Sequence, residues 1–191
     1  VSAEGLQMKR SGKLPEAEEA VLAKSVRTIV DQVGAMKRLV NEFRDYARLP
    51  AAELHPLDLN ALVTDVLQLY GSENATVPVA VELDPRCPPV AGDAQQLRQV
   101  VHNLLQNAQD ATEDAARKGQ VPAEPVHIST HWSESSRRVR LTVSDRGSGF
   151  APNILQRALE PYVTTKSGGT GLGLAVVKKI ADEHGARVDL V

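Results

Sequence analysis

The longest regular pattern in the chain is a row of apolar residues that predicts one long helix near the N-terminus. The apolar positions alternate steps of four and three residues, a period of about 3.5: Leu22, Val26, Ile29, Val33, Met36, Val40, Phe43 and Ala47. We expect this helix to start after Pro15, in the Glu-rich stretch Glu16–Glu19, and to end near Leu49-Pro50. So narrow a stripe favours a coiled-coil or four-helix-bundle partner, with an amphipathic helix lying on its own domain as the alternative.

Residues 1–10 read as the end of an earlier helix that Ser11-Gly12 closes. Residues 1–50 would then form a helical hairpin, and the Pro- and Ala-containing residues 51–56 a linker. Both ends of the chain look unfinished. We therefore expect a fragment whose second domain, residues 57–191, lacks its last strand.

Beyond residue 56 the pattern changes to alternating helices and strands. Helices are predicted over 59–70, where Asp58 supplies the cap, over 93–118, where Asp93 and Gln96 form a capping box, and from about Gly171 onward. Period-two alternation predicts strands over 77–83, 126–132 and 139–143, with a hairpin turn at 133–137 and a short strand at 187–191. This order predicts an α/β sandwich in which helices cover one face of a mixed sheet.

The helix over 93–118 carries two different faces. An apolar stripe that should pack on the sheet consists of Leu97, Val101, Leu104 and Ala108. Asn103, Asn107 and Asp110 are spaced four and three residues apart and share another face. Two carboxamides and a carboxylate suit Mg²⁺, which takes one or two protein oxygens and completes its shell with phosphate and water. Alone, such residues are more often solvated polar side chains.

Two glycine clusters favour a cation site over the alternative of solvated polar side chains. The first, Asp145-Arg-Gly-Ser-Gly-Phe150, follows a predicted strand. Asp145 could accept a hydrogen bond from the exocyclic amine of adenine, while Gly147 and Gly149 keep side chains away from the base. A simple Asp-x-Gly turn is the alternative.

The second cluster contains Gly169, Gly171 and Gly173, immediately before an apolar helical run. Backbone amides at that helix start would face phosphates, and the helix dipole would add attraction. Thr164, Thr165 and Lys166 lie just upstream, on a loop that could close over the γ-phosphate. Together the two clusters predict a nucleotide site.

Composition narrows the remaining choices. The net charge of −2 argues against nucleic acid as a partner. The single cysteine, Cys87, excludes an intrachain disulfide, and no Cys/His spacing suggests zinc. No apolar run is long enough to span a bilayer, so we expect a cytoplasmic chain without membrane contact, even if a parent protein is anchored in the inner membrane.

Four stretches, in this order and spacing, resemble the N, G1, F and G2 boxes of the GHKL (HATPase_c) superfamily as found in sensor histidine kinases. They read Gln99-Val-Val-His-Asn-Leu-Leu-Gln-Asn-Ala108, Asp145-Arg-Gly-Ser-Gly-Phe150, Glu160-Pro-Tyr-Val-Thr-Thr-Lys166 and Gly169-Thr-Gly-Leu-Gly-Leu174. The long helix resembles the second helix of the dimerisation and histidine-phosphotransfer domain. Its stretches Val26-Arg-Thr-Ile-Val-Asp-Gln-Val33 and Asn41-Glu-Phe-Arg-Asp-Tyr-Ala-Arg48 look most like nitrogen-regulation kinases of the NtrY type.

The resemblance implies a Bergerat-type fold that binds ATP and Mg²⁺. It places Asn107 on the metal, Asn103 near the γ-phosphate and Asp145 on adenine. Asn103 and Lys166 are the expected catalytic residues, with Asp110, Gly147, Gly149 and Thr165 also in the site. The same resemblance places the remaining nucleotide contacts in the ATP lid, at Gly169, Thr170, Gly171, Leu172 and Gly173.

A sensor kinase of this family would pass the γ-phosphoryl to a histidine and then to an aspartate of a response-regulator receiver domain, working as a homodimer through its helical hairpin. The family's phosphoacceptor lies in the first bundle helix, and none of the five histidines here has that context: His55, His102, His127, His131 and His184. We therefore expect ATP binding without self-phosphorylation. The alternatives are a binding and dimerisation module, or an ATPase of the gyrase, Hsp90 or MutL kind, which carries a general-base Glu where this chain has Asn103.

Overall fold

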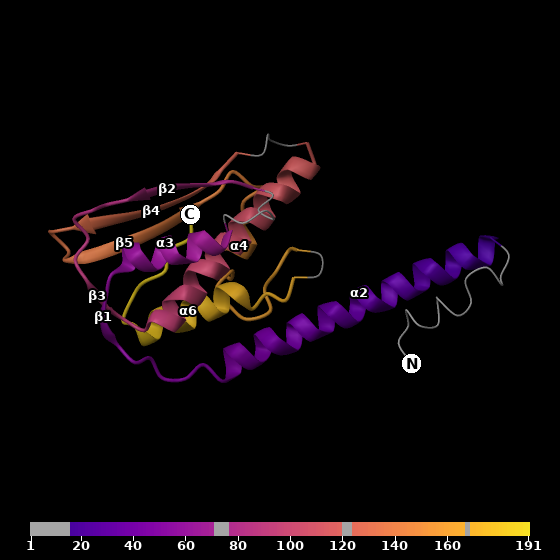
Figure 1. Cartoon of the computed structure of the whole chain (residues 1–191), viewed down its shortest axis with the longest axis horizontal. Coiled ribbons are helices and arrows are strands. Elements are labelled where there is room, and N and C mark those ends of the chain that lie inside the picture. Colours follow the sequence, from indigo (N-terminus) through magenta and orange to yellow (C-terminus); the bar gives the residue numbers. More distant parts are fainter. Residues whose placement is uncertain (1–15, 71–76, 120–123, 167–168) are drawn as a thin grey trace.

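The computed structural model of the chain describes residues 16–70, 77–119, 124–166 and 169–191. Helix α2 (Glu16–Ala47) extends far beyond the rest of the molecule (Figure 1). Much of its apolar stripe is open to solvent: Ile29, Val33 and Met36 are 53%, 59% and 65% exposed. Most of the stripe therefore does not lie on the chain's own domain. The helix predicted within residues 1–10 falls outside the described residues.

The remaining elements form an α/β domain, residues 55–191. Its helices are α3 (Leu59–Tyr70), α4 (Ala94–Arg117), α5 (Pro152–Leu155) and α6 (Gly173–Glu183). Its strands are β1 (His55–Leu57), β2 (Val79–Leu83), β3 (Val90–Gly92), β4 (Val126–Ser133) and β5 (Arg138–Ser144). Among the described residues, no helix is both long and apolar enough to cross a bilayer.

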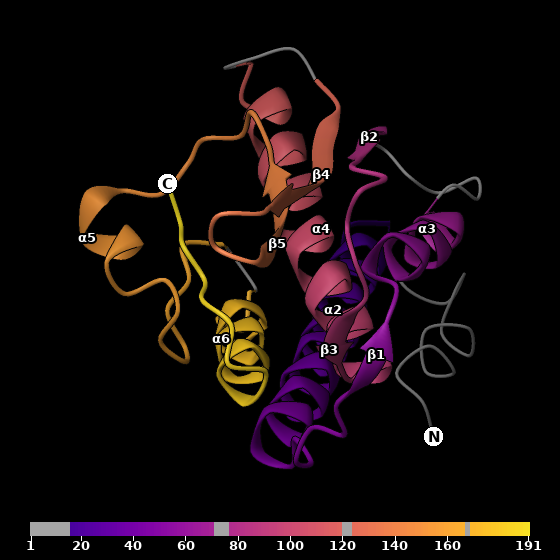
Figure 2. The same cartoon turned by 90° about the vertical axis from the view of Figure 1, so that its left-hand side faces the viewer.

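The main sheet is mixed, as predicted. Its strand order is β2-β4-β5, with β2 parallel to β4 and β4 antiparallel to β5. Along β4 the buried residues Val126, Ile128 and Thr130 alternate with more exposed ones, so only one face of the sheet enters the core. That core also contains Val101 and Leu105 of α4 and residues of α3. Helices cover one face, which confirms the predicted sandwich (Figure 2).

Several local predictions need correction. The short strands β1 and β3 pair antiparallel with each other and were not expected, because three residues are too few for a visible alternation. The linker predicted to run to residue 56 consequently overlaps a strand that starts at His55. The strand predicted at residues 187–191 is wrong. These residues have no regular structure and pair with no other strand among the described residues.

The start of α4 also differs in detail from the predicted capping box. Asp93 caps the helix by accepting hydrogen bonds from the backbone N–H groups of Gln95 and Gln96. The Gln96 side chain does not return the bond. Its Nε2 instead donates to the Pro50 carbonyl oxygen, 2.9 Å away, which ties the segment after α2 to α4.

Candidate functional site

Helix α4 supplies the polar face of the site. Burial of Val101, Leu105 and Ala108 against the core fixes how this helix is rotated about its axis. Asn103, Asn107 and Asp110 are left half-buried on another side, as their spacing predicts. The three residues therefore project from a rigid element.

The Lys166 ammonium group lies where oxygens of Asn107 and Asp110 converge. Its Nζ donates to Asn107 Oδ1 at 3.2 Å and to the Asn107 carbonyl oxygen at 3.4 Å. It also lies 3.0 Å from Asp110 Oδ2, and Gln106 Nε2 donates to the other Asp110 oxygen at 2.8 Å. This oxygen cluster thus holds one positive charge, which is the chemistry a cation site needs.

Asn103 joins α4 to the glycine-rich start of α6. Its Nδ2 donates to the Gly173 carbonyl oxygen at 3.2 Å. Leu172, immediately before α6, provides no side-chain cap for the N–H groups of the first turn. These amides lie at the positive end of the helix dipole, which favours the binding of an anion.

The first glycine cluster forms a turn that packs against α4. Asp145 Oδ1 accepts a hydrogen bond from the Gly147 N–H at 2.8 Å. A Cβ atom at Gly147 would lie only 2.7 Å from the Ala111 Cβ and 2.8 Å from the Ala111 carbonyl carbon, so glycine is required there. Because Ala111 is four residues after Asn107, this contact places Asp145 near the polar face of α4.

The backbone of the second glycine cluster packs against the backbone of Tyr162. Gly171 and Tyr162 both have left-handed backbone conformations, with φ of 68° and 66°. The Tyr162 N–H donates to the Gly171 carbonyl oxygen at 2.9 Å. A Cβ atom on Gly171 would come within 2.6 Å of the Tyr162 carbonyl carbon, so the two backbones pack too closely for any side chain.

Short-range hydrogen bonds hold the segment between Tyr162 and Gly171. Thr164 Oγ1 accepts from the Lys166 N–H at 3.1 Å, and the Gly169 N–H donates to the Lys166 carbonyl oxygen at 3.1 Å. Thr170 Oγ1 accepts from the Leu172 N–H at 3.3 Å. Leu172 is fully buried, so in this arrangement of the segment it is not open to a nucleotide.

The structure thus brings together five of the residues proposed from the sequence: Asn103, Asn107, Asp110, Lys166 and Gly173. Gly149, with a φ of 65°, lies in open space, and Thr165 is exposed beside the site. Sequence reasoning missed three residues that position the others: Gln106, Ala111 and Tyr162. Helical spacing from Asp110 and Asn107 could have identified the first two.

Ligand chemistry limits how a metal could bind. Among the described residues, no group of three or more His, Cys, Asp or Glu side chains is placed to hold a metal ion. A divalent cation at Asn107 would therefore need oxygens from another molecule to complete its coordination. The phosphates of a nucleotide are such a source.

Comparison with known proteins supplies the family. Residues 92–191 match the family described as histidine kinase-, DNA gyrase B- and HSP90-like ATPases. An NtrY-like sensor histidine kinase of Rickettsia bellii is 33% identical over 177 residues, which is 92% of this chain and 28% of that protein. Nitrogen regulation protein NtrY of Azorhizobium caulinodans is 30% identical over 194 residues, 100% of this chain and 24% of NtrY. The chain spans about a quarter of the length of these relatives.

Solved structures agree with this assignment. The full-length kinase ShkA in complex with AMPPNP is 28% identical, with a TM-score of 0.65 over 97% of this chain and 38% of ShkA. Histidine kinase ThkA, in complex with response regulator protein TrrA, has a TM-score of 0.67 over 96% of this chain and 50% of ThkA. At 23% identity the second likeness shows a shared fold alone. The chain therefore belongs to the histidine kinase-, DNA gyrase B- and HSP90-like ATPases, and the relatives that it matches along most of its length are GHKL sensor histidine kinases.

Proposed function

We propose that the α/β domain binds Mg·ATP between α4, the turn at Asp145 and the start of α6. In the whole protein it would transfer the γ-phosphoryl group to a histidine. The observation that carries the proposal is the convergence of Asn107 and Asp110 oxygens on the Lys166 ammonium group. Lys166 acts there as a stand-in for a metal cation, because both are positive charges that oxygen atoms surround.

Each part of the nucleotide has a matching set of groups. Asp145 would accept from the adenine amine beside the open backbone of Gly147 and Gly149. Asn107 would hold Mg²⁺, which when bound neutralises phosphate charge. The amides at the start of α6 and the Lys166 ammonium would face the phosphate oxygens.

The lid assignment concerns the segment closed by Gly171 and Tyr162. In this proposal Thr165, Gly169, Thr170 and the backbone of Leu172 lie over the phosphates, and Lys166 moves from Asn107 and Asp110 onto them. Catalysis would rest on orientation and charge stabilisation, without a covalent intermediate on this domain.

Asn103 favours phosphoryl transfer over ATP hydrolysis. Its carboxamide donates to the Gly173 carbonyl oxygen and has no basic group to take a proton from water. A water molecule at the γ-phosphate would thus lack a general base at this position. The site supports a kinase better than it supports an ATPase of the gyrase or Hsp90 kind.

The parent protein would add the remaining partners. We propose residues 1–50 as part of the dimerisation hairpin and the α/β domain that begins with β1 at His55 as the catalytic domain, with the residues between them as the linker. The exposed stripe of α2 would form the homodimer, and a response-regulator receiver domain would accept the phosphoryl group, as the complex of ThkA with TrrA suggests. A cytoplasmic location fits this role.

This chain alone would not phosphorylate itself. His184 follows the last residue of α6 and is bonded through both ring nitrogens, and His102 is exposed on α4. The other three lie on strands β1 and β4. Phosphoryl transfer would require a histidine-bearing helix supplied separately.

Calorimetry with AMPPNP tests the binding site. The wild-type chain should bind in a Mg²⁺-dependent way, Asn107→Ala should lose most of that binding, and Arg117→Ala, at the exposed end of α4, should retain it. Unchanged affinity in Asn107→Ala would falsify the metal assignment. For the reaction, radiolabelled ATP and a histidine-bearing bundle helix should yield labelled helix, and absence of label would favour a module that binds without phosphotransfer.

A further inference from the structure

Lys179 of α6 joins the α/β domain to the end of α2. Its Nζ donates to the Tyr46 carbonyl oxygen at 2.8 Å and lies 5.2 Å from the centre of the Tyr46 ring. Tyr46 is in the last turn of α2, where carbonyl groups have no partner within the helix. One ammonium group therefore caps a helix end and makes a cation–π contact, and both are favourable there.

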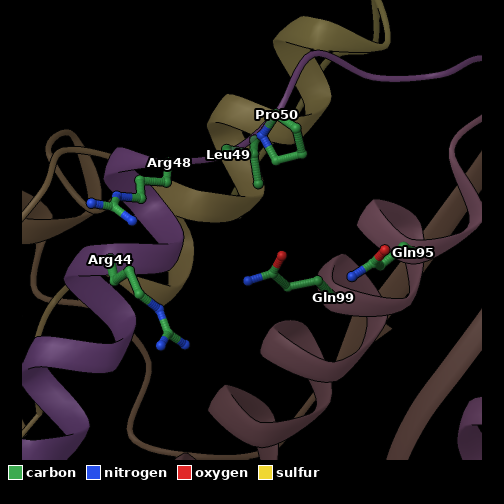
Figure 3. A pocket seen from close by; sticks show the side chains of 6 residues that line it. All are labelled: Arg44, Arg48, Leu49, Pro50, Gln95 and Gln99. Carbon is green, nitrogen blue, oxygen red and sulfur yellow. The ribbon is translucent and has the colours of Figure 1, made fainter.

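Polar bonds and an open cleft lie between the end of α2 and the α/β domain, a region called the joint below. A cleft of about 400 Å³ separates the last turn of α2 from the first turns of α4, lined by Arg44, Arg48, Leu49, Pro50, Gln95 and Gln99 (Figure 3). The segment after α2 is fastened through Gln96 to Pro50 and through the Glu53 N–H to Asp93 Oδ2, at 3.1 Å. Each of these polar contacts restricts how α2 can turn relative to the α/β domain.

Helix α6 connects this joint to the phosphate end of the site. At its start, Gly173 accepts from Asn103. At its end, His184 Nε2 accepts from the Asp93 N–H at 2.9 Å, and His184 Nδ1 bonds the Ile180 carbonyl oxygen at 2.8 Å. The helix is rigid because its inner face is buried. Lys179 lies six residues after Gly173, about 9 Å along the axis, so it acts at a distance from the phosphates.

We propose that Lys179 is a positioning residue that sets the angle between α2 and the α/β domain, and with it the direction in which bound ATP presents its γ-phosphate. This inference rests on the proposed phosphotransfer function for its catalytic consequence. Its structural part, the fixed angle, stands independently of that function. Lys179 contacts the backbone and ring of Tyr46 and no catalytic residue.

The chain offers a matched control in the neighbouring residue. Lys178 is on the same helix and pairs with Asp182 within α6. Lys178→Met removes the same charge without touching α2. Lys179→Met keeps the aliphatic stem but loses the donor and charge, whereas Lys179→Arg keeps both.

The structural part is tested by distance measurement between two spin labels. One label would be attached at Ser25→Cys on α2 and the other at Ser136→Cys in the β4–β5 turn, both exposed, in a Cys87→Ser background. We expect one narrow distance distribution for the wild-type side chain and for Lys178→Met. Lys179→Met should broaden or shift it, and Lys179→Arg should restore it.

The catalytic part is tested by phosphoryl transfer to a histidine-bearing bundle helix. In Lys179→Met, kcat should fall by about tenfold or more while KM for ATP and AMPPNP affinity stay unchanged, since small misplacements cost rate rather than binding. Unaltered distances and kcat in Lys179→Met would overturn the inference, as would a loss that Lys179→Arg fails to rescue. If the wild-type chain transfers no phosphoryl group, the proposed function fails, while the distance measurement still decides the role of Lys179.

Discussion

Gly171 and Tyr162 hold each other in left-handed backbone conformations, and the Tyr162 N–H donates to the Gly171 carbonyl oxygen at 2.9 Å. The positive φ of Tyr162 is an unusual strain for a bulky residue, and it persists because Gly171 leaves room for the Tyr162 backbone. This pair closes the segment that carries Lys166. The geometry of the candidate phosphate site therefore depends on the close approach of these two backbones.

Substituting Gly171 should damage both stability and nucleotide binding. Gly171→Ala would suffer strain from its φ of 68° and a collision of its Cβ with Tyr162 at 2.6 Å. Gly185→Ala is the matched control, since Gly185 has a φ of 59° and nothing within 4 Å of an added Cβ. The control should cost about 1–2 kcal/mol. Melting curves and AMPPNP titrations should show a larger loss for Gly171→Ala, and equal losses would contradict the close-packing argument.

Removal of the Lys166 charge should weaken ATP binding. Lys166→Met would lose a charge-assisted contact to phosphate, so we expect affinity for AMPPNP with Mg²⁺ to fall about tenfold. Lys118→Met is the control, because Lys118 pairs with Asp114 at the far end of α4. Calorimetry is the measurement. Equal affinities in Lys166→Met and the wild type would show that this ammonium stays on α4 when nucleotide binds.

Stability should depend on pH through Asp84, in the turn after β2. The Arg86 guanidinium and the Arg86 and Trp132 N–H groups donate to this carboxylate, at 2.9 to 3.1 Å, and hold its pKa far below the usual range. A lowered folded-state pKa means that the stabilisation is complete above the unfolded-state pKa of about 3.9 and is lost as pH falls below it toward the folded-state value.

The measurement compares Asp84→Asn with the wild type by urea unfolding at pH 7, pH 4 and pH 3. The free energy of unfolding should differ most at pH 7, and the difference should shrink at pH 3. Asp65→Asn is the control, since the Asp65–Arg98 pair is about half exposed and should contribute little. A difference that does not change with pH would refute the ionic account of Asp84.

The apolar stripe of α2 should mediate self-association. Val33 and Met36 are exposed and lie on the stripe, so Val33→Glu together with Met36→Glu would place charges in a buried helix interface. We expect light scattering to give a dimer for the wild type and a monomer for the double variant. Val21→Glu, 66% exposed but off the stripe, should remain dimeric. A monomeric wild type at high concentration would defeat the dimer proposal for this chain.

Local signals explain which parts of the fold were predictable. The bounds of α4 could be read from Asp93 at its start and Lys118 at its end, because capping depends on neighbours in sequence. The polar face of Asn103, Asn107 and Asp110 followed from helical spacing alone. The pairing of β1 with β3 could not be predicted, because His55 meets Gly92 only through tertiary structure.

The candidate site was likewise predictable only where it depends on local sequence. Residue types and glycine spacing predicted its members, but not their contacts. Lys166 reaches Asn107 across 59 residues of chain, and no local pattern encodes that bond. Similarly, no periodicity would assign a left-handed conformation to Tyr162, since a tyrosine adopts it only when the surrounding backbone imposes it.

The unexpected strand β1 limits how far the α/β domain can lie from the end of α2. Helix α2 ends at Ala47 and β1 starts at His55, so only residues 48–54 form the tether between them. Fully extended, they reach at most about 25 Å. Tether length thus sets an upper limit on the distance between the end of α2 and the start of β1, however the two parts turn relative to each other.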